Sequence, residues 1–158
     1  MPNSGIDSFD QALLAEVQQN NLVPARVLAE RVGLSESAVL RRLRRLRAEG
    51  VITADVSVVR PASLGRPVTA IVLVNMVREG RAQIDAFTER LHGRPEVVST
   101  WYVTGNADFV LVLNLADLAA YDAFTSEVFL ADPNIGKFET LMSLRELVPG
   151  PCPRKGPR

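Results

Sequence analysis

The sequence predicts an α+β fold: an N-terminal helix-turn-helix (winged-helix-like) domain, then a C-terminal ferredoxin-like βαββαβ domain. Three observations support this. Apolar residues recur at helical spacing before residue 60, β-rich and helical runs alternate after residue 67, and Pro and Gly residues separate the two regions. We expect the helix-turn-helix domain at 1–52, a hinge strand and linker at 53–67, the ferredoxin-like domain at 68–148 and a disordered tail at 149–158.

The first half is expected to form three helices. Asp7 suits the N-cap of the first, and the second and third are expected over Pro24–Val32 and Glu36–Glu49. Gly33 suits the end of the second helix and Ser35 can cap the third, so a turn of about three residues joins them. Two helices joined in this way form the helix-turn-helix pattern.

The second half alternates between strands and helices, after a segment at 51–59 that fits a short strand or an extended hinge. We expect four strands and two helices, at Val68–Met76, Glu79–Leu91, Val97–Thr104, Phe109–Leu115, Leu118–Leu130 and Ile135–Val148. The last helix should turn Leu118, Tyr121, Phe124 and Val128 inward. The strands at 68–76 and 110–115 are apolar enough for a sheet covered on both faces. Two helices cover one face, so the other indicates a dimer.

The third predicted helix concentrates charge in an otherwise balanced chain. The formal net charge is zero, with 18 Lys+Arg and 18 Asp+Glu, which by itself argues against a nucleic-acid partner. This helix, however, holds five Arg and two Glu, so its local net charge is +3. At ~100° per residue its apolar residues share one face. The opposite face is expected to carry Ser37, Arg41, Arg44, Arg45 and Ala48.

An arginine stripe on the second helix of this motif suits the major groove of double-stranded DNA. Arg binds guanine edges or phosphates, and the N-terminal end of this helix is the one inserted. Arg42 and Arg47, on the flanks, fit phosphate contacts better than base contacts. The candidate DNA-binding residues are Ser35, Glu36, Ser37, Arg41, Arg42, Arg44, Arg45 and Arg47. The alternative is a solvated basic helix or one that binds an acidic protein.

Several segments, in order and at matching spacing, resemble the leucine-responsive / asparagine regulator (Lrp/AsnC) family of transcription factors. The resemblance covers roughly residues 6–148. Its segments are Ile6-Asp7-Ser8-Phe9-Asp10, Leu28-Ala29-Glu30-Arg31-Val32-Gly33-Leu34-Ser35, Arg42-Leu43-Arg44-Arg45-Leu46, Glu49-Gly50-Val51-Ile52, Leu64-Gly65, Val103-Thr104-Gly105-Asn106-Ala107-Asp108-Phe109 and Asp132-Pro133-Asn134-Ile135. One departure is Arg47, where the family usually carries an acid.

The resemblance implies an N-terminal DNA-binding domain and a C-terminal domain for regulation and assembly. Family members pair through their sheets into homodimers, and dimers often join into octameric rings. Many bind an amino acid between dimers. These properties are expectations for this chain.

The Gly105–Asp108 turn is the candidate effector site. Gly105 lets a ligand approach the backbone, Asp108 can accept bonds from an α-ammonium group, and backbone N–H groups can hold an α-carboxylate. The alternative is a simple hairpin turn in which Asp108 caps local N–H groups. With the resemblance, the candidate effector residues are Thr104, Gly105, Asn106, Asp108 and Thr140.

Other features argue against catalysis, metal binding and a membrane location. The only histidine, His92, is expected at an exposed helix end, and the only cysteine, Cys152, lies in the predicted tail. No nucleophile–base pair is recognisable, so we expect no catalytic residue, metal or cofactor. Trp101 and Tyr102 fit packing at a sheet or subunit interface better than ligand stacking. The longest apolar run is far shorter than the ~20 residues of a membrane helix, and no signal peptide is expected.

The sequence therefore predicts a cytoplasmic, sequence-specific DNA-binding transcriptional regulator. Its expected partners are double-stranded DNA, a second copy of the chain in a homodimer that assembles to an octamer, and a small effector such as an amino acid. Two rival functions stay open at this point. One is a metabolite-sensing or assembly module whose helices bind protein, and the other is an enzyme built on the ferredoxin-like half.

Overall fold

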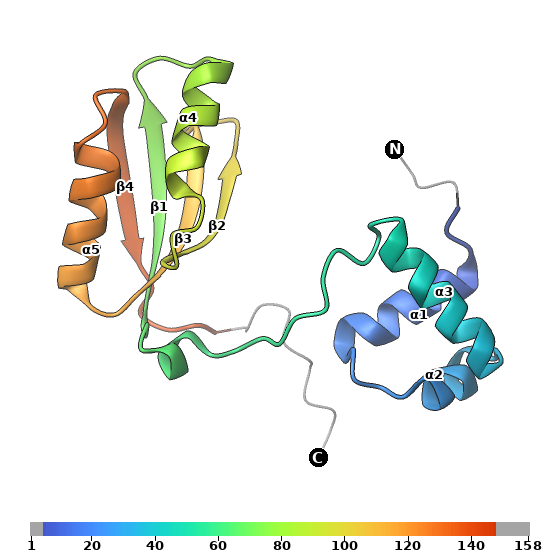
Figure 1. Ribbon diagram of the computed structural model, residues 1–158. Coiled ribbons are helices and arrows are strands. Elements are labelled where there is room, and N and C mark those ends of the chain that lie inside the picture. The colour runs from blue at the N-terminus through green and yellow to red at the C-terminus, as the bar shows by residue number, and fades with distance from the viewer. Residues whose placement is uncertain (1–4, 148–158) are drawn as a thin grey trace. The chain divides into compact units, whose positions relative to one another are not determined.

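The computed structural model describes residues 5–147, which form two compact units (Figure 1). The chain divides between Val58 and Val59, inside the predicted linker at 53–67. The tail predicted at 149–158 lies outside the described residues. Within the described part, no helix is long and apolar enough to cross a membrane.

The first unit contains three helices around a small apolar core. They are α1 (Ser8–Gln19), α2 (Ala25–Val32) and α3 (Glu36–Ala48). Each supplies buried side chains to the core, which includes Leu13, Leu28, Val39 and Leu43. Burying these residues fixes which face of α3 points inward, so the polar face of α3 is left to solvent.

Local capping explains where these helices begin and end. Asp7 accepts a hydrogen bond from the Asp10 N–H (2.9 Å), and the Asp10 side chain accepts one from the Asp7 N–H (3.1 Å), which makes a capping box. Gly33 ends α2 with a φ of 71°, and the Ser35 hydroxyl accepts a bond from the Ala38 N–H. The three caps predicted at Asp7, Gly33 and Ser35 are confirmed.

The segment after α3 is extended but forms no strand within the described residues. Ile52 packs against the helical core, and residues 53–60 are exposed. Of the two predicted forms, the extended hinge is therefore correct. A strand also needs a neighbouring strand to complete its hydrogen-bond ladder, and no described strand pairs with this segment.

The second unit is a four-stranded antiparallel sheet with two helices on one face (Figure 1). The strand order is β2-β3-β1-β4. After a short 3₁₀ helix at Pro61–Leu64, the elements are β1 (Val68–Met76), α4 (Arg81–Leu91), β2 (Val97–Tyr102), β3 (Phe109–Leu115), α5 (Leu118–Thr125), a π-helical turn (Ser126–Leu130) and β4 (Ile135–Met142). This is the predicted βαββαβ order.

Some boundaries and one inward-facing residue differ from the prediction. The strand predicted to reach Val148 ends at Met142. Leu118, expected inside, is 66% exposed. It is the first residue of α5, whereas Tyr121 and Phe124 of the following turns make the contacts with the core.

The two faces of the sheet have different environments. One face packs its side chains against α4 and α5, and includes Val72, Leu111 and Leu113. The pleat turns the alternate residues to the opposite face. We call this the open sheet face, defined by Ile71, Leu73, Trp101, Val110, Val112 and Leu141. Its Trp101 and Leu141 are about half exposed, at 51% and 50%, so a large apolar surface lacks a cover within residues 59–147.

Candidate DNA interface and effector pocket

Arg41 and Arg44 form the free part of the arginine stripe on α3. Both residues are exposed. Neither takes part in an ion pair among residues 5–147, in contrast to the other three arginines of the helix. Their guanidinium groups are therefore available for guanine edges or phosphates.

Arg42 and Arg45 are both paired within the first unit, although Arg45 was expected on the outward stripe and Arg42 on its flank. Arg42 donates to Asp7 (2.7 Å) and Asp10 (2.9 Å), and its guanidinium lies over the Phe9 ring. Arg45 donates to Asp10 and to the Gly5 carbonyl oxygen. Helical periodicity placed Arg45 on the outer face, but a long side chain can reach a neighbouring helix from there. These two arginines tie α3 to the start of α1.

Asp10 is the centre of this arrangement. Its side chain is fully buried, and it accepts bonds from Arg42 and Arg45. Burial raises the cost of the charged form, but the two arginines and the Asp7 N–H outweigh it, so the pKa of Asp10 is lower than usual. The pKa of Asp7 is also lowered, first by the Asp10 N–H and then by Arg42. Both carboxylates are thus charged at neutral pH.

Arg47 is also paired in the free protein. Its Nε and Nη2 donate to the two carboxylate oxygens of Asp55 at 2.7 and 3.1 Å. This fork lowers the pKa of Asp55. This pairing leaves Arg47 with fewer free N–H groups than Arg41 and Arg44.

The beginning of α3 presents three polar residues. Ser35, Glu36 and Ser37 are all exposed. The Ser35 hydroxyl caps the helix and lies 3.2 Å from the Ser37 hydroxyl. Ser37 and Glu36 thus point from a rigid helix end, which is the geometry that base-edge contacts need.

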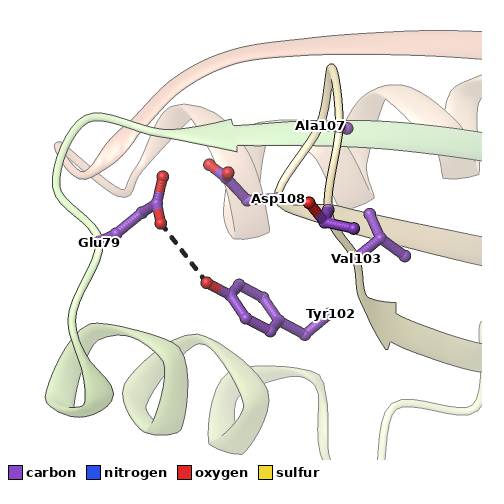
Figure 2. Close-up of a pocket in the computed structure, with 7 residues that line it drawn as sticks. Glu79, Tyr102, Val103, Ala107 and Asp108 are labelled. Atoms are coloured by element: carbon purple, nitrogen blue, oxygen red, sulfur yellow. Dashed lines mark hydrogen bonds between the residues drawn. The ribbon is translucent and has the colours of Figure 1, made fainter.

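An open pocket of about 440 Å³ lies beside the β2–β3 turn (Figure 2). Its lining residues are Glu79, Tyr102, Val103, Thr104, Gly105, Ala107 and Asp108. Three of the five predicted effector residues, Thr104, Gly105 and Asp108, are therefore brought together. Gly105 has a φ of 127°, a conformation that only glycine adopts without strain.

One carboxylate oxygen of Asp108 has a structural role, and the other faces the pocket. One carboxylate oxygen, Oδ2, accepts the Met76 N–H at 2.7 Å, and the Asp108 N–H donates to the Val74 carbonyl. The local capping considered in the sequence analysis is thus present. Oδ1 has no hydrogen-bond donor among the described residues, and the carboxylate points into the pocket (Figure 2).

Tyr102, for which packing was expected rather than ligand contact, and Glu79, which the sequence did not indicate, also line the pocket. The Tyr102 hydroxyl donates to Glu79 at 3.4 Å (Figure 2). Desolvation, followed by the charges of Glu79 and Asp108, raises the pKa of Tyr102, so its hydroxyl stays a donor. Tyr102 ends the strand that leads into the turn, so its position in the sequence could have indicated that it lies beside the candidate site. Glu79 belongs to the β1–α4 loop, and no local pattern indicated it.

Two predicted effector residues lie outside the pocket lining. Thr140 is on β4, at the far edge of the sheet from β2, and its hydroxyl is 2.7 Å from that of Tyr121 on α5. Asn106 contributes its carbonyl oxygen to Asn75. Thr140 was placed in the site by resemblance alone, and the strand order separates it from the turn within one chain.

The described residues hold no cluster of three or more His, Cys, Asp or Glu side chains that fits a metal ion. His92 is the C-cap residue of α4 and is exposed, as predicted.

Comparisons with known proteins agree with this division of the chain. Residues 6–53 match the winged helix-turn-helix DNA-binding family, and residues 69–152 match the Lrp/AsnC ligand binding domain. The fold and the two matches define a DNA-binding transcriptional regulator with a separate ligand-binding domain. The chain belongs to the Lrp/AsnC family, and it is a regulator, not an enzyme.

Curated relatives and solved structures extend the comparison. The chain is 44% identical over 137 residues to an HTH-type transcriptional regulator, y4tD, of Sinorhizobium fredii, covering 87% of this chain and 81% of that one. It is 31% identical to the leucine-responsive regulatory protein of Rhizobium meliloti, covering 90% and 91%. A regulator from Neisseria meningitidis, solved with L-methionine, is 27% identical with a TM-score of 0.82, covering 90% and 92%.

Proposed function

We propose that the chain binds DNA chiefly through Arg41 and Arg44, with Glu36 and Ser37 at the base edges. The observation that supports this is the division of the α3 arginines into two free and three paired side chains. The three paired arginines make secondary contacts with phosphates, for which DNA competes with their carboxylate partners. As a DNA-binding regulator, the protein would act in the cytoplasm.

A salt-titrated mobility-shift assay tests the interface. Arg41→Ala and Arg44→Ala together should weaken binding to the selected operator by tenfold or more, because a bidentate guanine contact is worth ~1–3 kcal/mol. Arg81→Ala, which removes an exposed arginine of the second unit, is the matched control. Wild-type affinity in the double variant would refute the proposal.

We also propose that the open sheet face pairs two chains into a homodimer, and that such dimers assemble further to an octamer. Half-exposed Trp101 and Leu141 on the open sheet face support this, because burying such a patch is favourable. Trp101→Glu should dissociate the dimer in sedimentation analysis, whereas Leu118→Glu, on an exposed part of α5, should not. A monomeric wild type would refute both assemblies.

The pocket at the β2–β3 turn is proposed to bind an amino-acid effector. Its location in the matched ligand-binding domain supports this, as does the L-methionine bound to the Neisseria relative. Asp108 would hold the α-ammonium group and turn N–H groups the α-carboxylate. Calorimetry with the twenty amino acids tests the site, and Asp108→Asn should abolish any heat. No heat with any of them on the folded oligomer would refute it.

A further inference from the structure

We infer that the effector of this protein is a basic amino acid, one whose side chain carries a second positive charge. This rests on the proposed amino-acid site and adds the class of ligand. The carrying observation is that two carboxylates, of Glu79 and Asp108, share one pocket to which no Lys or Arg contributes a lining side chain.

The two carboxylates come from different elements and lie in the same space. Glu79 belongs to the loop between β1 and α4, and Asp108 to the end of the β2–β3 turn. Both carboxylates point into the space above the Tyr102 ring (Figure 2). The charges of both also act on the Tyr102 hydroxyl, so their fields overlap inside the pocket.

One ammonium group cannot satisfy both carboxylates as well as two cationic groups can. Among the described residues, Glu79 receives one neutral hydrogen bond, from Tyr102 at 3.4 Å, which is a long one. The Asp108 carboxylate accepts one bond from within the described part of the chain, from the Met76 N–H. A zwitterionic ligand has no net charge to offset these two negative charges, whereas a basic amino acid has a net charge of +1.

An apolar ligand side chain would also be disfavoured at Glu79. Packing such a side chain against the carboxylate removes water from the charge without supplying a donor, which costs free energy. A terminal ammonium or guanidinium group supplies that donor through a charge-assisted hydrogen bond. Glu79 thus both attracts a cation and rejects an apolar group, the two components of specificity.

The pocket also offers a surface for the methylene chain of such a ligand. Val103, Ala107 and the Tyr102 ring are among the lining residues. Long basic side chains bury their methylene groups on apolar surfaces while their charged ends stay paired or solvated. The combination of apolar wall and carboxylate end fits lysine or arginine.

Calorimetry on the full-length protein tests the inference with matched ligands. L-lysine and L-norleucine have the same chain length and differ in the terminal ammonium group. L-lysine or L-arginine should bind at least tenfold more tightly than L-norleucine and L-methionine. Glu79→Gln should lower the affinity for the basic ligand about tenfold, whereas Glu89→Gln, the same change on exposed α4, should not. Helical content and operator binding verify that each variant is folded.

The outcomes separate this inference from the proposed site. Tighter binding of methionine or norleucine would overturn the ligand class while leaving the amino-acid site in place. Binding of no amino acid would overturn both. Equal effects of the Glu79 and Glu89 substitutions would show that the preference for a basic ligand does not come from Glu79.

Discussion

Arg42 of α3 donates to Oδ1 of the fully buried Asp10 of α1 at 2.9 Å. Asp10 also accepts a bond from Arg45, so one carboxylate links the first helix to two positions on the recognition helix. Two of the five arginines that made α3 look like a uniform basic stripe therefore stabilise the domain. The proposed DNA surface on α3 is therefore smaller than the number of its arginines indicated.

The first prediction concerns Asp10. Asp10→Asn keeps the shape of the side chain and removes its charge, so the bonds from Arg42 and Arg45 weaken. We expect the free energy of unfolding at pH 7 to fall by about 1.5–3 kcal/mol, the usual value of hydrogen bonds to charged groups. Urea unfolding followed by circular dichroism measures it, with Glu49→Gln on the exposed end of α3 as the control.

The pH dependence of that difference has a definite sign. The pKa of Asp10 is lower in the folded protein than its ordinary value of 3.8. Its contribution is therefore present in full above that ordinary value and is lost as the pH falls below it. We expect wild type and Asp10→Asn to converge in stability on acidification below about pH 4. A difference that stays constant to pH 2 would contradict the charged role of Asp10.

A second prediction separates the arginines of α3 by what they stabilise. Arg41→Ala should weaken operator binding and leave the melting temperature unchanged. Arg42→Ala should lower the melting temperature, because it removes bonds to Asp7 and Asp10. Paired measurements of melting and of operator affinity on both variants check this. Equal thermal stability of the two would show that the Arg42 bonds contribute nothing.

A third prediction concerns Thr140. Thr140→Val and Tyr121→Phe each remove the hydrogen bond between the two hydroxyls. Each should cost about 1 kcal/mol of unfolding free energy, and the double variant should cost less than the sum. Effector affinity should not change in Thr140→Val. A loss of binding heat in that variant would place Thr140 in the effector site after all.

A fourth prediction concerns Gly105. Its φ of 127° disfavours any side chain, although an added Cβ would meet nothing within 4 Å. Gly105→Ala should therefore cost about 1–3 kcal/mol through backbone strain alone. Fluorescence of Trp101 during urea unfolding, at fixed protein concentration, measures it. Asn106→Ala, at the next residue, is the control and should change stability little.

Local patterns were sufficient for the order of the elements and for several of their ends. Asp7, Gly33 and Ser35 act on their own neighbours in the chain, so their roles as caps could be predicted. The β1 and β3 strands were predicted at their observed bounds because apolar, β-branched runs bury well in a sheet. The turn at 105–108 was likewise recognisable as part of a candidate site.

Interactions between distant residues could not be predicted in this way. The partners of Arg42 and Arg45 lie 32 to 40 residues away in the chain, and periodicity gives only the direction of a Cβ atom, not the reach of a long side chain. Glu79 enters the pocket from a loop that the sheet brings beside Tyr102. Thr140 lies away from it within one chain, because the strand order puts β4 at the opposite edge.

The amino-acid pattern alone thus specified the helix-turn-helix, the βαββαβ order and the turn beside the proposed effector pocket, because hydrophobic period and capping act over a few residues. The tertiary structure decided which arginines are free to meet DNA and which carboxylates meet in the pocket. Charges select their partners by distance in space, and that distance exists only after the helices and the sheet have packed.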